Sequence, residues 1–184
     1  MAGDVNFKFA VLGSASTSEE SLEGRKAYAV GVLVASLNGV LLTGGCPGLP
    51  HAAAQGARSV GGPTIAISPA TNREEHRLVY TYPLDSEVIL YTGMGTKGRN
   101  VILVRSADAC VFIGGGMGTL NEFTIAFDDL DSCCAIGVLL NSGGYSGEFL
   151  RLAGLVDRSP RAALIAESDP RKLVEALFKH LEKS

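Results

Sequence analysis

Apolar residues in this chain come in short continuous runs that alternate with stretches of helical spacing. A continuous apolar run bounded by glycine or proline predicts a strand that is buried on both faces. Strands are predicted at 7–14, 39–45, 63–69, 87–93, 109–115 and 135–141, with a further strand at 162–168. Helices are predicted at 18–38, 50–61, 97–107, 119–130, 146–156 and 170–183.

This alternation indicates one α/β domain over residues 1–184, without repeats or an interdomain linker. We expect a Rossmann-like, doubly wound sheet of six to seven mostly parallel strands, in a three-layer α/β/α arrangement. The segment 70–85 has no apolar period. Because long loops in compact domains are commonly functional, it is interpreted either as a lid over a site or as a solvated connector.

Composition narrows the class of protein. The chain has 184 residues, of which 46% are hydrophobic and 19% charged, with a formal net charge of -3. The net charge gives no basic surface that would favour nucleic-acid binding. No apolar run is long enough to span a bilayer, and the first residues do not resemble a signal peptide. We expect a cytoplasmic protein that binds neither nucleic acid nor membrane.

The cysteines and the acidic run give no metal site. The four cysteines are Cys46, Cys110, Cys133 and Cys134, without CxxC or zinc spacing. We expect small buried hydrophobic side chains, with the adjacent pair pointing apart. Asp128, Asp129 and Asp131 would suit either a metal or a solvated helix end, and the second is favoured, so no metal is assigned.

Glycines follow several of the predicted strands. In an open parallel sheet, ligands bind beyond the carboxyl ends of the strands, where strand order reverses. Packing alone does not require so many glycines there, so these residues are candidates for binding a phosphorylated ligand. The candidates are Gly13, Ser14, Gly44, Gly45, Gly48, Gly93, Gly95, Gly114, Gly115, Gly116, Met117, Gly118 and Thr119.

The stretch "GGGMGTLNE", from Gly114 to Glu122, joins a predicted strand to a predicted helix. Glycines there let a phosphate reach free backbone amides at the positive end of the helix dipole. Glu122 falls in the first helical turn, where it would either cap the helix or act on a neighbouring part of the ligand. The loop is neither a Walker motif nor the GxGxxG fingerprint.

This loop, with "RNVILVRSADACVFI" before it, resembles the Lonely Guy (SLOG) superfamily, long mislabelled lysine decarboxylases. The similarity covers roughly residues 7–140 and includes the earlier loop "TGGCPGLPHAAAQGA". It implies a phosphoribohydrolase that releases a base from a nucleoside 5′-monophosphate, needs no cofactor, and uses Arg99 and Glu122 as catalytic residues. Arg99 would bind phosphate or assist the leaving base, and would hold Glu122 ionised. Glu122 would stabilise the positive charge that develops on the ribose.

Two departures point to a sister branch. Gly114 replaces the proline of the superfamily loop, and "TGMGTKG" precedes Arg99 where the cytokinin enzymes carry a Met-His type sequence. The combination looks more like DprA/Smf-like proteins and molybdenum-cofactor carrier proteins. In the carriers of that branch, the cavity binds a phosphorylated pterin and no base is released. Three function classes therefore stay open: a nucleotide hydrolase, a carrier of the molybdenum cofactor or another phosphorylated cofactor, and a nucleotide sensor. Lysine decarboxylation is not among them.

Other residues carry weaker predictions. Lys97 and Arg105 are interpreted as solvated surface charges. His51 either faces the ligand or is structural, with the second favoured, and His76 falls in the segment 70–85. The resemblance also implies a homodimer or larger homo-oligomer, formed by the helix 123–130 and the helix that carries Arg99.

Overall fold

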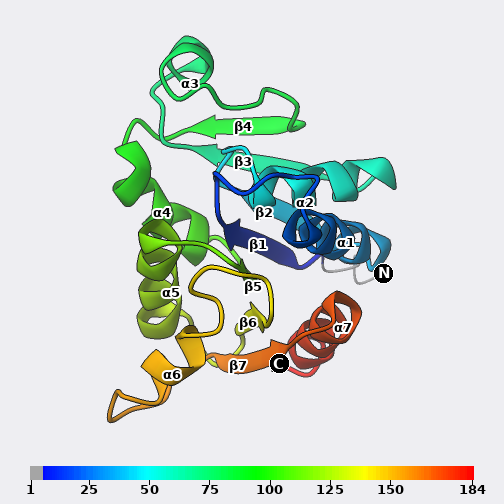
Figure 1. Ribbon diagram of the computed structural model, residues 1–184, viewed down its shortest axis with the longest axis vertical. Helices are drawn as coiled ribbons and strands as arrows, with labels where there is room; N and C mark the ends of the chain where they lie inside the picture. The colour runs from blue at the N-terminus through cyan, green and yellow to red at the C-terminus, as the bar shows by residue number, and fades with distance from the viewer. Residues whose placement is uncertain (1–5) are drawn as a thin grey trace.

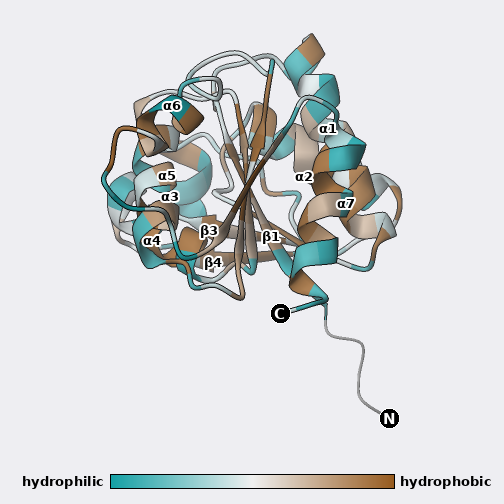
Figure 2. Cartoon of the chain, turned by 90° about the horizontal axis from the view of Figure 1, so that it is seen from below, coloured by the Kyte–Doolittle hydropathy of each residue, from teal (hydrophilic) through white to brown (hydrophobic). Residues whose placement is uncertain are grey.

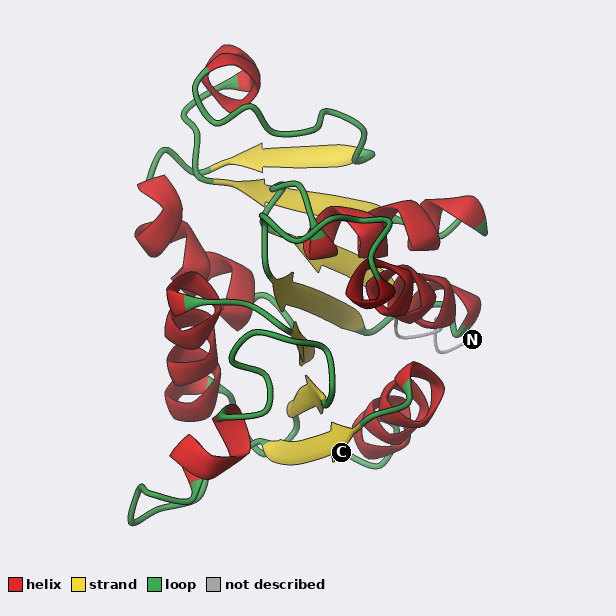
Figure 3. Ribbon diagram, viewed as in Figure 1, coloured by secondary structure: helices red, strands yellow, loops and turns green. Residues whose placement is uncertain are grey.

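The computed structural model describes residues 6–184 and contains one parallel sheet of seven strands in that range. The strands are β1 (Lys8–Gly13), β2 (Val40–Thr43), β3 (Thr64–Ser68), β4 (Val88–Tyr91), β5 (Ala109–Ile113), β6 (Ala135–Leu139) and β7 (Ala163–Glu167). Their order across the sheet is β4-β3-β2-β1-β5-β6-β7 (Figures 1 and 3). The predicted doubly wound, Rossmann-like α/β fold is confirmed.

The strand order reverses between β1 and β5. These neighbours are in register from Phe9 opposite Ala109 to Gly13 opposite Ile113. The chain leaves β1 toward one half of the sheet and leaves β5 toward the other, so the two loops diverge and leave a crevice between them. The fold therefore predicts a ligand site beside Gly13 and the loop that begins at Gly114.

Helices cover both faces of the sheet (Figure 2). Helices α1 (Leu22–Ser36), α2 (Leu49–Ser59) and α7 (Pro170–Leu181) pack on one face. Helices α4 (Gly95–Arg105), α5 (Met117–Asp129) and α6 (Phe149–Ala153) pack on the other. Each face has its own apolar cluster, because central strands such as β5 and β6 are buried on both sides. The predicted burial of both faces is wrong for the edge strand β4, where Val88 is 47% and Leu90 51% exposed. None of the helices in residues 6–184 is both long and apolar enough to cross a membrane.

Polar side chains fix several helix starts. Ser21 caps α1 by accepting a bond from Gly24 N at 3.0 Å. The segment 70–85 holds a short helix, α3 (Arg73–Leu78), which the pattern did not predict. Asn72 caps it by accepting from Glu75 N at 3.0 Å. Its six residues are too few to show an apolar period, so only the cap signals it.

The cysteine prediction is right for two residues and wrong for two. Cys46 and Cys110 are buried, but Cys133 is exposed and Cys134 is half-buried. The adjacent sulfurs lie 4.0 Å apart, so the expectation that they point apart is wrong. Both residues lie in the turn before β6, where the backbone is not extended and neighbouring side chains need not face opposite ways.

The acidic run at the end of α5 is ion-paired. Asp128 pairs with Arg158, Asp131 with Arg161 at 2.6 Å, and Asp129 with Arg105 at 4.0 Å. These side chains are largely exposed, as expected for a solvated helix end. Within residues 6–184, no cluster of three or more histidine, cysteine or acidic side chains is arranged to hold a metal.

Candidate ligand-binding site

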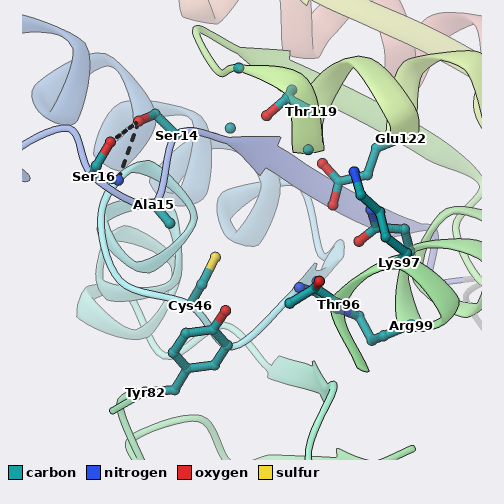
Figure 4. Close-up of a pocket in the computed structure, with 14 residues that line it drawn as sticks. Ser14, Ala15, Ser16, Cys46, Tyr82, Thr96, Lys97, Arg99, Thr119 and Glu122 are labelled. Atoms are coloured by element: carbon teal, nitrogen blue, oxygen red, sulfur yellow. Dashed lines mark hydrogen bonds between the residues drawn. The ribbon is translucent and has the colours of Figure 1, made fainter. Parts of the chain in front are cut away.

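A cavity of about 390 Å³ opens at the switch point, between the loops that follow β1 and β5 (Figure 4). Ser14 and Ser16 form one side, while Glu122 and Lys97 lie opposite and Cys46 and Tyr82 close a third side. The lining residues are Gly13, Ser14, Ala15, Ser16, Cys46, Tyr82, Thr96, Lys97, Arg99, Asn100, Gly116, Gly118, Thr119 and Glu122.

The cavity gathers part of the predicted site. Among its lining residues are seven predicted ones: Gly13, Ser14, Arg99, Gly116, Gly118, Thr119 and Glu122. The other predicted residues are not among the lining residues: Gly44, Gly45, Gly48, Gly93, Gly95, Gly114, Gly115 and Met117. The Met117 side chain is 66% exposed and points to solvent. Gly115 has a φ of 94°, and a Cβ there would lie 2.3 Å from Thr119 Oγ1, so this glycine makes room for the threonine.

The first turn of α5 faces the cavity with its backbone. Gly116 precedes the helix, and no side chain caps it. A Cβ added to Gly116 or Gly118 would meet no atom within 4 Å, so both positions open onto free space. The first amides of a helix have no intrahelical acceptor, and the helix dipole adds partial positive charge there. This turn is chemically suited to an anion, and Thr119 adds a hydroxyl.

Arg99 is the most unusual side chain of the cavity. It lies in the second turn of α4 and is only 5% exposed. Among residues 6–184 its guanidinium has no hydrogen bond or ion pair, and its buried Nε has no partner. The charge of Glu122 acts on Arg99 only through space, and a buried cation without a bonded partner is costly to desolvate. Such a group is tolerated where a ligand supplies the missing anion.

Glu122 lies in the second turn of α5 and is 8% exposed. With its nitrogen turned toward Glu122, the Asn100 amide donates to Oε1 at 3.1 Å and to the Thr96 carbonyl at 2.9 Å. Burial raises the pKa of Glu122 to about 7, and the nearby charges of Arg99 and Lys97 oppose that rise. Arg99 favours the ionised form of Glu122, as expected, but desolvation outweighs this attraction, so Glu122 is only partly ionised near neutral pH.

Seven of the lining residues were not predicted as ligands from the sequence, and Lys97, Cys46 and Tyr82 are among them. Lys97 is exposed, as expected, but it lines the cavity and is not simply a solvated surface charge. Burial raises the pKa of Cys46 to about 11, so this side chain is a thiol at neutral pH. Tyr82 comes from the segment 70–85, and burial raises the pKa of its hydroxyl. The local sequence could have indicated Lys97, two residues before Arg99, and Cys46, which directly follows Gly45.

Neither His51 nor His76 lines the cavity. His51 Nδ1 lies 2.7 Å from Glu19 Oε1, and its Nε2 lies 2.8 Å from Asp85 Oδ2. His76 is fully buried, with Nδ1 at 2.8 Å from Ser68 Oγ and Nε2 at 2.8 Å from the Pro83 carbonyl. Both histidines are held by neighbouring groups, which agrees with the structural interpretation.

The sequence model of the SLOG cluster4 family matches residues 6–156, a range that includes the sheet from β1 to β6 and the whole cavity. The chain belongs to the SLOG cluster4 family. The resemblance stated from "GGGMGTLNE" is thereby confirmed at the level of the superfamily. Over 105 residues, this SLOG chain is 38% identical to an uncharacterised protein of Archaeoglobus fulgidus. That match covers 57% of this chain and 63% of the relative, so it spans less than two thirds of the relative's length.

Solved structures of similar fold include molybdenum-cofactor proteins. The molybdenum cofactor binding protein of Rippkaea orientalis is 28% identical, with a TM-score of 0.75 over 95% of this chain and 96% of that one. The molybdenum cofactor carrier protein of Chlamydomonas reinhardtii is 24% identical, with a TM-score of 0.72 over 96% and 99%. DNA processing protein A of Helicobacter pylori, whose structure concerns single-stranded DNA binding, is 16% identical, with a TM-score of 0.65 over 94% and 80%. The last two likenesses concern the fold alone.

Proposed function

We propose that the cavity binds a small molecule through its terminal phosphate, and that the protein carries such a molecule. The observation that supports this most is the buried, unpartnered guanidinium of Arg99, which lines a cavity beside the open first turn of α5. A phosphate satisfies both features, because it bonds to amides at a helix start and forms charge-assisted bonds to an arginine. Of the predicted phosphate loop, Gly116, Gly118 and Thr119 line the cavity and would hold it.

The charges around the cavity favour a dianionic group. Arg99 and Lys97 contribute two positive charges, and α5 adds the positive end of its dipole. Glu122 is the one carboxylate among the lining residues, and it is partly neutral near its pKa of about 7. This balance suits a phosphate monoester, which carries up to two charges near neutral pH. It suits a phosphodiester less well.

The molybdenum cofactor is the cargo we favour. The 28% identity to the Rippkaea orientalis protein over nearly the whole of both chains supports this choice. No metal-ligand cluster occurs in residues 6–184, and Cys46 is a protonated thiol. We therefore expect the pterin and its phosphate, rather than direct coordination of the metal, to hold the cofactor. The cavity residues fit the phosphate part of that molecule.

Hydrolysis of a nucleoside 5′-monophosphate is the second candidate. The observation in its favour is that Arg99 and Glu122 line one cavity. A carboxyl with a pKa of about 7 can exchange a proton near neutral pH, which suits a general acid or base. In its ionised form, Glu122 would instead stabilise positive charge on the ribose.

Base release and binding separate the two candidates. The wild type, Glu122→Gln and Arg99→Ala are incubated with AMP, and free adenine and AMP affinity are measured. A carrier gives no adenine with any of the three, and only Arg99→Ala weakens binding. A hydrolase gives adenine with the wild type, and Glu122→Gln lowers kcat by roughly a hundredfold while affinity holds or rises. Equal adenine release by wild type and Glu122→Gln contradicts a catalytic role for Glu122.

A second experiment identifies the cargo. The protein is purified from cells that make the molybdenum cofactor and from cells that lack it, and bound small molecules are identified by mass spectrometry. A phosphorylated pterin found only in the first preparation supports the carrier proposal. A nucleotide found in both preparations would favour the hydrolase or a nucleotide sensor instead.

Two further proposals concern the cellular location and the oligomeric state. We expect a cytoplasmic homodimer or larger homo-oligomer, formed by α4 and α5, that binds neither nucleic acid nor membrane. Exposed apolar side chains on these helices, Val101 at 39% and Met117 at 66%, support this choice of interface. Gel-shift measurement with single-stranded DNA tests the nucleic-acid prediction, which tight binding would overturn.

A further inference from the structure

Tyr82 is the aromatic side chain among the lining residues of the described cavity. Its ring lies edge-on to the His76 ring, with centroids 5.5 Å apart and an interplanar angle of 86°. Its backbone amide donates to the His76 carbonyl at 3.1 Å. Since His76 is itself fixed by Ser68 and Pro83, it supports Tyr82 on one side. The Tyr80 ring packs against Tyr82 as well, with centroids 5.4 Å apart, and the Tyr82 side chain also lines the cavity.

The backbone directly before Tyr82 is strained. Thr81 has a φ of 54°, in the left-handed region that a β-branched residue rarely adopts. Strain of this kind persists only where the surrounding structure enforces it, and it gathers at ligand clamps and active sites. At this position it turns the chain so that the next side chain faces the cavity.

Asp85, three residues after Tyr82, fastens the same segment to α2. Its Oδ2 lies 2.8 Å from His51 Nε2 and also pairs with Arg58. The other ring nitrogen of His51 lies 2.7 Å from Glu19 Oε1, which also accepts from Gly48 N at 3.3 Å. Ionised carboxylates can only accept hydrogen bonds, so each ring nitrogen of His51 that bonds to Glu19 or Asp85 does so as a donor. His51 therefore joins the two loops that carry Tyr82 and Ser14.

From this arrangement we propose that residues 79–87 form the wall that receives the planar ring of the ligand. Tyr82 is the ring-contacting residue and specificity determinant, and His51 and Asp85 are positioning residues that latch the wall. The proposal rests on the phosphate site described above and adds a second subsite to it. The ligand class is then a phosphate monoester that also carries a flat heteroaromatic ring, and a bare sugar phosphate would miss half of the site.

A pair of probes tests the ring wall: AMP, which has a ring, and ribose 5-phosphate, which has none. Tyr82→Leu keeps an apolar side chain but removes the aromatic face. It should weaken AMP binding about tenfold, within the range for loss of one stacked base, and leave ribose 5-phosphate affinity within about twofold. Tyr82→Phe keeps the ring and should bind AMP like the wild type. Equal losses for both probes in Tyr82→Leu would overturn the ring wall.

The positioning role of Asp85 and His51 is tested separately, by the rate of AMP dissociation. Asp85→Asn and His51→Gln should each speed AMP dissociation and lower AMP affinity several-fold, with ribose 5-phosphate unaffected. In Tyr82→Leu, adding Asp85→Asn should cause no further loss, because the latch acts only through Tyr82. Asp157→Asn, at an exposed position after α6, is the matched control and should change neither affinity. Full additivity of the Tyr82 and Asp85 variants would overturn the positioning role.

The same titrations distinguish failure of this inference from failure of the phosphate site. If Gly118→Ala weakens both probes and Tyr82→Leu weakens neither, the phosphate site stands and the ring wall is wrong. If wild type binds neither probe, while a competent fold is shown by its circular dichroism and cooperative unfolding, both proposals are wrong for nucleotide-like ligands.

Discussion

The guanidinium of Arg99 lies against the backbone of Gly44, where an added Cβ would fall 1.7 Å from Nη1. Gly44 belongs to the loop after β2 and Arg99 to α4, so the contact joins elements far apart in the sequence. Gly44 is not at a positive φ, so its backbone conformation does not explain the glycine. The glycine provides the space that the buried arginine occupies.

Gly44→Ala should therefore displace Arg99 without unfolding the protein. The clash involves the end of a flexible side chain, which can move, whereas the ligand-binding position of the guanidinium would be lost. We expect AMP and ribose 5-phosphate affinity to fall roughly tenfold, the usual scale for losing a charge-assisted bond. Calorimetric titration measures this, with thermal unfolding as the check on fold. Unchanged affinity would show that Arg99 is not a ligand-binding residue.

Gly118→Ala tests the anion cradle at α5. Its Cβ would meet no protein atom within 4 Å, so the fold should be unaffected and the melting temperature equal to or above that of the wild type. The methyl group would enter the space proposed for phosphate, and ribose 5-phosphate affinity should drop roughly tenfold or more. Gly147→Ala is the matched control, because a Cβ there also meets nothing and the residue does not line the cavity. Similar affinity in both variants would place the phosphate elsewhere.

The raised pKa of Glu122 predicts a pH dependence of stability. Because burial raises this pKa from 4.5 to about 7, the folded state binds the proton more tightly than the unfolded state. The stabilisation is complete below pH 4.5 and is lost as pH rises toward about 7. In the wild type, the loss amounts to about 3 kcal/mol at most, on the order of the shift multiplied by 1.36 kcal/mol per pH unit.

Glu122→Gln removes this titration. The free energy of unfolding of the variant, minus that of the wild type, should therefore rise across the same pH range. Urea unfolding of both proteins, at several pH values between about 4.5 and 8, measures the difference. Parallel pH profiles for the two proteins would contradict the assigned pKa shift.

The proposed interface predicts the oligomeric state. Val101, on α4, is a partly exposed apolar side chain, and its replacement by glutamate would put a charge into an interface formed by α4 and α5. Val101→Glu should sediment as a monomer at micromolar concentration, while the wild type sediments as a dimer or larger. Leu22→Glu, at an exposed position on α1 in the opposite layer, should leave assembly unchanged. A monomeric wild type would refute the interface.

The sheet was predictable because each of its strands is apolar on both faces, a pattern that helices of this length do not share. Helix α3 was not, because six residues held by the Asn72 cap show no period. Arg99, Gly116, Gly118, Thr119 and Glu122 were found because their spacing follows the superfamily loop. Which glycines face the cavity could not be predicted, since Gly44 and Gly115 make room for side chains of other elements.

Tyr82 illustrates the part of a site that sequence patterns miss. It reaches the cavity through the strained turn at Thr81 and through contacts with His76, Asp85 and His51, none of which form a motif. The contribution of Lys97 was underestimated for a related reason. A charged residue at a helix start is usually solvated, and only the fold shows that this helix start borders a cavity.

The adjacency of β1 and β5 has a mechanical consequence. The strands on either side of this junction belong to two sequence-contiguous halves of the sheet, β1 to β4 and β5 to β7. Within residues 6–184, no other strand pair joins these halves. A ligand seated between Ser14 and the first turn of α5 would bridge the junction like a cross-link between the halves. Its binding energy should then slow amide exchange in both halves together, including strands such as β4 and β7 that lie far from the ligand.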